Sequence, residues 1–270
     1  MENNSLLDVQ HISHMFHLKR KMTVKAIDDV SFQIKKGEIY GLVGESGSGK
    51  STVARCIMNI YKPSEGEIFY KGIPICKSKE FRKNRKMLQM TRQMIFQDSA
   101  SSLNPRMKIG DIVAEPLRIY SGKGRPGKKE IEKQLELVGL DRSYMEKYPC
   151  ELSGGQRQRV AIARALSTKP ELIVADEPIA SLDVSIQAQM VNLFRKLQKE
   201  QGFSFLFIAH DLSMVEFLCD RTGVMYHGKL VEEGRTQDIF AHPEHEYTKA
   251  LLAAVPIPDP RIERQKGEVL

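Results

Sequence analysis

The sequence predicts an α/β fold built around a mostly parallel sheet. Apolar segments of strand length alternate with segments of helical periodicity, and a glycine-rich loop joins one such strand to the helix that follows it. The 270-residue chain is 41% hydrophobic and 28% charged, as in ordinary globular proteins, and is long enough for one large domain or two smaller lobes.

The first elements mix antiparallel strands with a strand–loop–helix unit. From Val30 to Ile60 we expect a strand "VSFQI", a turn "KKG", a strand "EIYGLVG", a glycine loop and a helix "KSTVARCIMNI". The following "YKPSEGEIFYKG" is typical of a turn, a strand and a second turn, because Pro63 and Gly66 interrupt it.

The middle of the chain, from Arg82 to Pro149, is polar, basic and helix-prone. In "EIEKQLELVGL" the apolar Ile131, Leu135 and Val138 recur at helical spacing, which predicts a helical lobe. The loop "GKGRPGKKE" is interpreted as a solvated surface rather than a nucleic-acid patch, because no aromatic residues for base stacking are interleaved.

After Ser153 the α/β alternation returns. A helix through Leu166, a strand "ELIVAD", a helix "SIQAQMVNLFRKLQKEQG" stopped by Gly202 and a strand "FSFLFIA" ending at His210 are predicted. The apolar face of the longer helix comprises Ile186, Met190, Leu193 and Leu197. Ligands of such sheets bind beyond the carboxyl ends of the strands, where the glycine loop, Asp176 and His210 converge.

Charge and cysteine usage narrow the function classes. The net charge of +7 fits an anionic ligand such as a nucleotide triphosphate, nucleic acid or an anionic membrane surface. The four cysteines contain no C-x-x-C pair, so neither a zinc site nor a disulfide framework is expected. His11, His14 and His17 lie three residues apart in an extended segment and therefore alternate faces, which argues against a metal site.

We expect neither a secretory signal nor a membrane-spanning segment. Met1–Gln10 lacks a basic region followed by an apolar one, and no apolar run approaches the roughly 18 to 20 residues of a spanning helix.

The segment "GESGSGKST" matches the phosphate-binding pattern G-x-x-x-x-G-K-[ST] and is called the P-loop below. Its glycines let backbone N–H groups curl around phosphates, and the helix that follows presents its positive end. Lys50 is expected to reach the β- and γ-phosphate oxygens, and Ser51 to bind Mg²⁺. The candidate nucleotide-binding residues here are Gly44, Glu45, Ser46, Gly47, Ser48, Gly49, Lys50, Ser51 and Thr52.

The segment "LIVADE" has four apolar residues before two carboxylates, which is typical of a buried strand that ends in exposed acids. Asp176 is the candidate Mg²⁺ ligand, and Glu177 the candidate general base that polarises the attacking water. A helix-cap pair is the alternative, and the nearby P-loop disfavours it.

A second candidate phosphate site lies in "ELSGGQRQR", where a serine and two glycines precede a helix. The ordered set "GESGSGKST", "MIFQD", "LSGGQ", "LIVADEP", "SLD" and "FIAHD" resembles the nucleotide-binding subunit of ABC transporters. The resemblance covers nearly the whole chain and implies a P-loop NTPase (RecA-like) core with an N-terminal antiparallel β subdomain and an inserted α-helical subdomain. It implies a core at residues 1–97 and 153–240, a helical signature subdomain at 98–152 and a C-terminal tail at 241–270.

The resemblance also implies roles for residues outside the P-loop. Gln97 would contact Mg²⁺ or the attacking water and relay the nucleotide state to the membrane subunits. His210 would hold the γ-phosphate, Asp183 would lie at a dimer interface, and Phe16 would stack on adenine, with His17 as the weaker candidate. The helix start would close over the ATP of a second subunit through Ser153, Gly154, Gly155 and Gln156.

Two further segments, "QDSASSLNPRM" and "HPEHEYTKALLAAVPIPDP", resemble the ATPase subunits of the oligopeptide, dipeptide and nickel permease group. One departure is Ser99, where that group often has proline. The resemblance implies an ATP- and Mg²⁺-dependent ATPase that drives peptide import, with nickel import as the alternative.

The implied partners are a second ATPase chain, a distinct one rather than an identical copy, and two transmembrane permease subunits, one of whose coupling helices would bind around Ser102–Tyr120. An extracytoplasmic substrate-binding protein would take part indirectly, and nucleic acid is not expected. The implied location is peripheral, at the cytoplasmic face of the cell membrane.

Two other classes remain open on the sequence. A soluble ABC ATPase that acts on nucleic acid, ribosomes or an enzyme complex usually joins two cassettes or carries long insertions, and neither is present. A small-molecule kinase would leave "LSGGQ" and "SLD" unexplained.

Overall fold

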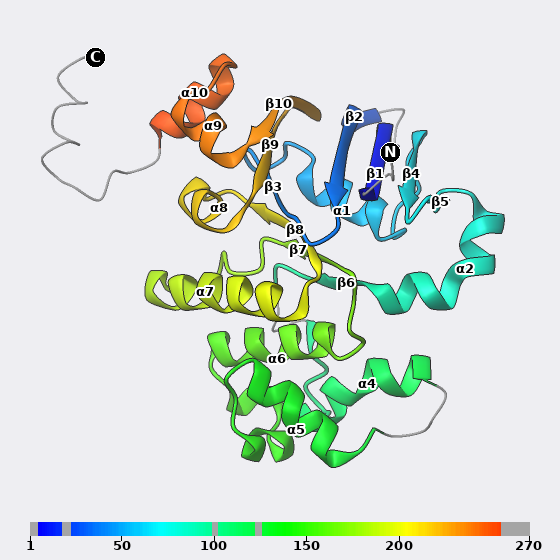
Figure 1. The fold of residues 1–270 in the computed structure, drawn as a ribbon, viewed down its shortest axis with the longest axis vertical. Helices are drawn as coiled ribbons and strands as arrows, with labels where there is room; N and C mark the ends of the chain where they lie inside the picture. Colours follow the sequence, from blue (N-terminus) through cyan, green and yellow to red (C-terminus); the bar gives the residue numbers. More distant parts are fainter. Residues whose placement is uncertain (1–4, 18–22, 99–101, 122–125, 255–270) are drawn as a thin grey trace, which may run out of the picture.

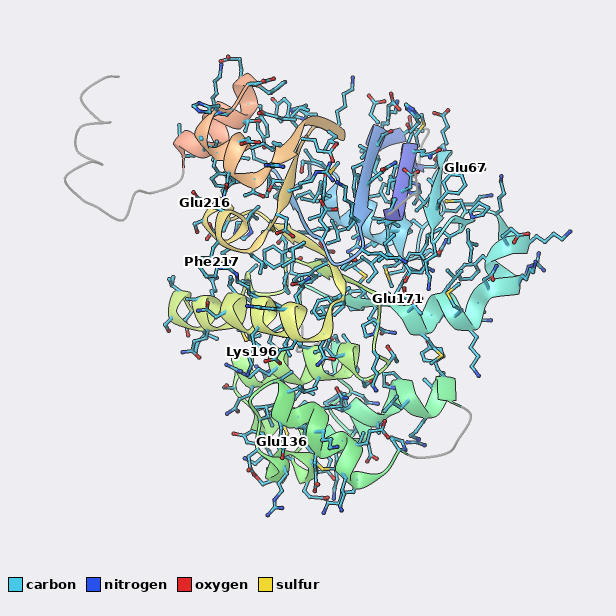
Figure 2. All side chains as sticks on the ribbon, viewed as in Figure 1. Glu67, Glu136, Glu171, Lys196, Glu216 and Phe217 are labelled. Carbon is cyan, nitrogen blue, oxygen red and sulfur yellow. The ribbon has the colours of Figure 1, made fainter. Side chains whose placement is uncertain are left out.

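The computed structural model describes residues 5–17, 23–98, 102–121 and 126–254, and these form an α/β structure with two sheets (Figure 1). Across these ranges, no helix combines the length and the apolar character needed to cross a bilayer. Charged side chains cover the outer surface, among them Glu136, Lys196 and Glu216 (Figure 2).

The larger sheet has the order β10-β9-β3-β8-β7-β6. Its strands β9, β3, β8, β7 and β6 run parallel, and β10 pairs antiparallel with β9 at the edge. The strands are β3 (Ile39–Val43), β6 (Arg92–Ile95), β7 (Leu172–Asp176), β8 (Ser204–Ala209), β9 (Arg221–Tyr226) and β10 (Lys229–Arg235). The mostly parallel sheet predicted from the sequence is confirmed.

The smaller sheet is antiparallel, with the order β2-β1-β4-β5. Its strands are β1 (Ser5–His17), β2 (Thr23–Lys35), β4 (Glu65–Tyr70) and β5 (Ile73–Pro74). The predicted strand "VSFQI" is only the last part of β2, whose first half begins with three exposed residues and lacks a clear apolar alternation.

Alternate residues of the large sheet face two separate hydrophobic cores. Leu42, Val174 and Ile208 pack with the small sheet and with helix α1 (Lys50–Ile57). Val43, Ala175 and Phe207 face the other core, which holds α6 (Gly154–Leu166), α7 (Val184–Gln201) and α8 (Leu212–Leu218). Because β-strand side chains alternate sides, α1 and α6 cover opposite faces of the sheet.

Residues 102–151 carry helices α4 (Ile109–Ser121) and α5 (Lys128–Leu137) and two 3₁₀ turns, η1 (Arg142–Glu146) and η2 (Pro149–Glu151). Ile131, Leu135 and Val138 are buried, as their spacing predicts. The prediction that the helical lobe begins at Arg82 was wrong, because helix α2 (Ser78–Thr91) is followed at once by strand β6 of the large sheet.

The end of the described chain carries two short helices, α9 (Thr236–Ala241) and α10 (Glu246–Ala253). They lie beside β9 and β10 in Figure 1. Ser99 and the proline-containing segment 255–270 fall outside the described residues.

Candidate functional site at the P-loop

The P-loop joins β3 to α1, and its geometry depends on glycine. Gly44 and Gly49 have φ values of +143° and +104°, and Gly49 is the N-cap of α1. A Cβ atom on Gly44 would lie 2.1 Å from the carbonyl oxygen of Met225, and one on Gly49 would lie 2.3 Å from that of Ala26. Only glycine allows this close approach, and the N-terminus of α1 that follows is of the kind that binds anions.

We expect Gly44→Ala to unfold at a clearly lower urea concentration than Gly37→Ala. Both residues have positive φ, which costs an alanine about 1–2 kcal/mol. Only Gly44 adds a backbone clash, since a Cβ on Gly37 would meet nothing within 4 Å. Urea unfolding followed by circular dichroism measures the difference, and equal midpoints would contradict the tight packing described here.

Lys50 is 3% exposed and points back into the P-loop. Its Nζ donates to the carbonyl oxygens of Gly44 and Glu45 at 2.7 and 2.8 Å and to Ser48 Oγ at 3.3 Å. Burial lowers the pKa of Lys50, while the carboxylates of Glu177, Asp176 and Glu45 oppose that shift. A buried ammonium surrounded by oxygens is suited to bind phosphate.

The carboxylates predicted at the end of β7 meet the P-loop. Ser51 Oγ donates to Asp176 Oδ1 at 2.7 Å, and Asp176 is 3% exposed. Gln97 Nε2, at the end of β6, donates to Glu177 Oε2 at 2.9 Å. The parallel register of β6 and β7 therefore brings Gln97 beside Glu177, although the two residues are 80 positions apart in sequence.

Glu177 has a backbone conformation that is rare for a side-chain-bearing residue. Its φ is +47°, and its N–H donates to the carbonyl oxygen of Ile208 on the neighbouring strand at 3.0 Å. Such left-handed residues cost about 1–3 kcal/mol and cluster at functional sites. His210, at the end of β8, is exposed and lines the same small cavity as Glu177.

These residues fit a magnesium ion. Ser51 and Asp176 share a hydrogen bond, and both present oxygen atoms, the ligand type that Mg²⁺ prefers. Because Mg²⁺ takes much of its shell from water and substrate phosphates, one carboxylate and one hydroxyl beside a phosphate site suffice. In the described ranges, no group of three or more His, Cys, Asp or Glu residues forms an all-protein metal cage.

The second predicted phosphate site begins α6, on the face of the large sheet opposite to α1. Ser153 Oγ accepts from the N–H of Gln156 at 3.3 Å, and Gln156 Oε1 accepts from the N–H of Ser153 at 3.0 Å. These two hydrogen bonds form a capping box at the start of α6. The two residues between Ser153 and Gln156 are glycines and have no side chains. A Cβ on Gly155 would meet the side chain of Ile186, at the start of α7, at 2.9 Å.

The remaining predicted residues lie at the start of α7 and at the end of β1. Asp183 is exposed and is the N-cap of α7. Phe16 packs edge-on against Tyr61 and His14, with ring centroids 5.4 and 4.7 Å away, and His17 is exposed.

One contact of the P-loop was missed by sequence reasoning. The N–H of Glu45 donates to the hydroxyl of Tyr247 in α10 at 2.9 Å. Tyr247 lies in the segment "HPEHEYTKALLAAVPIPDP", but nothing in its spacing indicates a partner 202 positions earlier.

The fold and the site define a P-loop ATPase, and comparisons with known proteins specify its family. The family model described as "ABC transporter" matches residues 27–180, and that described as "Oligopeptide/dipeptide transporter, C-terminal region" matches residues 231–270. The chain belongs to the ABC transporter family and is an ATP-hydrolysing, ATP-binding subunit within it. Its C-terminal match places it in the oligopeptide/dipeptide group of that family.

Relatives and solved structures agree with this assignment. The oligopeptide transport ATP-binding protein OppF of Streptococcus mutans is 51% identical over 97% of this chain and 85% of its own length. The dipeptide transport ATP-binding protein DppF of Lactococcus lactis is 46% identical over 100% of this chain and 87% of its own.

Among solved structures, the ATP-binding cassette MJ0796, a dimer in a post-hydrolysis state bound to ADP and Pi, superposes with a TM-score of 0.76 at 28% identity. The superposition covers 85% of this chain and 98% of that one.

Proposed function

We propose that this chain hydrolyses ATP to drive the import of di- or oligopeptides through a membrane permease. The observation that carries the proposal is the Lys50, Ser51, Asp176, Glu177 and Gln97 group at the P-loop, in a chain about half identical to oligopeptide transport ATP-binding proteins. These five residues support the ATPase activity, and the relatives' names indicate the class of molecule that is imported. Nickel import by the same group is the alternative cargo.

The chemistry we propose assigns one task to each side chain. The N–H groups at the start of α1 and the Lys50 ammonium bind the phosphates. Glu177 accepts the proton of the attacking water, Gln97 orients that water through its bond to Glu177, and His210 holds the γ-phosphate. Mg²⁺ beside Ser51 and Asp176 would neutralise charge on the phosphates. Phe16 is the proposed adenine contact.

We further propose that Ser153, Gly154, Gly155 and Gln156 bind the ATP of a second ATPase chain, with Asp183 at the interface. Support comes from the placement of α1 and α6 on opposite faces of the sheet, which separates the two phosphate-binding helix starts of one chain. The proposed partner is a distinct chain. Binding of ATP closes the two chains onto each other, and hydrolysis of ATP lets them open again.

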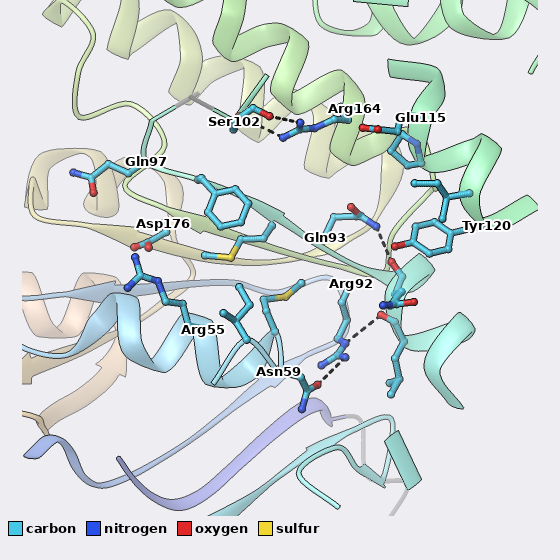
Figure 3. Close-up of a pocket in the computed structure, with 18 of the residues that line it drawn as sticks. Arg55, Asn59, Arg92, Gln93, Gln97, Ser102, Glu115, Tyr120, Arg164 and Asp176 are labelled. Carbon is cyan, nitrogen blue, oxygen red and sulfur yellow. Dashed lines mark hydrogen bonds between the residues drawn. The ribbon is translucent and has the colours of Figure 1, made fainter. Parts of the chain in front are cut away.

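A groove between α2, β6 and α4 is the proposed docking site for a permease helix. Exposed apolar side chains line it, namely Ile60, Phe96 and Ile119, whose exposed fractions are 52%, 41% and 65%. Gln97 and Asp176 lie at one end of the groove and Tyr120 at the other (Figure 3). A helix bound there would contact the residue that bonds to Glu177.

We expect Ile119→Asp to abolish most co-purification with the permease while the isolated chain keeps its ATPase activity. Burying an unpaired carboxylate in an apolar contact is strongly unfavourable, so association should weaken at least about tenfold. Arg118→Asp puts the same acid on the preceding residue of α4, which does not line the groove, and serves as the control. Equal losses in both variants would contradict the proposed docking site.

The proposed function is tested by purifying a tagged Glu177→Gln chain with ATP from membranes of the native host. Recovery of two permease chains and a second ATPase, followed by peptide and nickel uptake assays in a deletion strain, would support import and identify the cargo. Recovery of ribosomes, nucleic acid or a soluble enzyme instead would refute the transport function and leave the ATP site intact.

A further inference from the structure

The C-terminal helix α10 is bonded to the P-loop through a single peptide unit. The N–H of Glu45 donates to the Tyr247 hydroxyl at 2.9 Å. The carbonyl of the same peptide unit, which belongs to Gly44, accepts from Lys50 Nζ at 2.7 Å. This peptide therefore lies between the Lys50 ammonium on one side and the Tyr247 hydroxyl on the other.

Tyr247 is itself held in place by the end of the large sheet. Its ring stacks on Tyr226, the last residue of β9, with centroids 4.1 Å apart and an interplanar angle of 29°. The loop before α10 is fixed by Glu232 of β10, whose carboxylate accepts from the N–H groups of Glu244 and His245 at 2.9 and 3.1 Å. These contacts fix the Tyr247 ring and therefore the position of its hydroxyl oxygen.

The peptide needs such an anchor because it follows a glycine. Gly44 has a φ of +143°, and glycine permits both orientations of the peptide after it. A flipped peptide would turn its N–H toward the Lys50 ammonium and its carbonyl away from it. The Tyr247 hydroxyl stabilises the orientation in which the carbonyl meets Lys50, and aligned hydrogen bonds strengthen one another.

The hydroxyl is in the right protonation state for this contact. Burial raises the pKa of Tyr247 above its ordinary value, although the hydrogen bond from Glu45 opposes the shift. Tyr247 is therefore neutral at physiological pH, and its oxygen is free to accept the N–H of Glu45.

We infer that Tyr247 is a positioning residue of the ATP site, which fixes the Gly44–Glu45 peptide and through it Lys50. The inference rests on the proposed ATPase function of this same site. It gives the C-terminal region matched over residues 231–270 a role in nucleotide binding by its own chain, because Tyr247 is part of that region.

The test compares Tyr247→Phe with Tyr226→Phe in the full chain. Each variant removes one hydroxyl from the same stacked pair, but only the Tyr247 hydroxyl bonds to the P-loop. Among the described residues the hydroxyl of Tyr226 makes no hydrogen bond. We expect Tyr247→Phe to weaken binding of a fluorescent ATP analogue about fivefold, with an unchanged melting temperature. Tyr226→Phe should bind like the wild type.

The rate of amide hydrogen exchange in the segment 44–50 is a second measurement, and it would not change if Tyr247 only stabilised the fold. Exchange there should speed up in Tyr247→Phe and stay unchanged in Tyr226→Phe, without a change elsewhere in the sheet. Equal affinities and equal exchange in the two variants would overturn the inference. A wild-type chain that binds no ATP would instead refute the proposed function itself, so the two failures are distinguishable.

Discussion

Replacing Glu177 with glutamine is expected to lower ATP hydrolysis by about 10²–10⁴-fold while ATP binding is retained. Glutamine keeps the shape of the side chain and can still accept a hydrogen bond from Gln97. In the wild-type chain Gln97 Nε2 donates to Glu177 Oε2 at 2.9 Å. It cannot accept the proton of the attacking water. The variant should therefore accumulate in an ATP-bound state, which phosphate-release kinetics and filter-bound nucleotide would measure together.

The matched control is Glu171→Gln, at the other end of the same strand. Glu171 lies just before β7, where its partly exposed side chain forms an ion pair with Lys71 at 2.6 Å. Exposed pairs of this kind contribute about 0–1 kcal/mol, so this variant should keep both hydrolysis and binding. If Glu177→Gln hydrolysed ATP at the wild-type rate, Glu177 would not be the general base.

Residues of the ATP site that lie close in sequence could be predicted, because their spacing alone defines them. The P-loop pattern is a local signal, and in the structure Lys50 bonds to the carbonyl oxygen of Gly44 and Ser51 to Asp176. The position of the acids at the end of "LIVADE" could be predicted in the same way, since an apolar run followed by carboxylates indicates the end of a buried strand. The expected exposure was wrong for Asp176, which is buried against Ser51.

Two contacts between distant segments could not be predicted from residue patterns. The bond from Gln97 to Glu177 joins positions 80 apart, and it depends on β6, a strand of four residues that composition does not distinguish from the helix before it. The bond from Glu45 to Tyr247 joins positions 202 apart and depends on how α10 packs beside β9. The resemblance to a family identified Gln97 but gave no role to Tyr247.

Replacing Lys50 with methionine should weaken ATP binding and slow ATP hydrolysis. Methionine fills the buried space of the lysine stem but presents no charge, so the phosphates lose a charge-assisted hydrogen bond. Affinity should fall about 10- to 100-fold and turnover by about 10²–10³-fold. The carbonyls of Gly44 and Glu45, which Lys50 contacts at 2.7 and 2.8 Å, would also lose their shared donor.

Comparing Lys50→Met with Glu177→Gln distinguishes a residue that binds ATP from one that acts only in the hydrolysis step. Isothermal titration with ATP should give a measurable affinity for Glu177→Gln and a much weaker one for Lys50→Met, although both variants hydrolyse ATP slowly. Lys50→Arg serves as a charge control, because it keeps the cation but changes its geometry, and should recover part of the binding. Wild-type affinity in Lys50→Met would mean that the buried ammonium does not contact the nucleotide and that the helix N-terminus alone binds it.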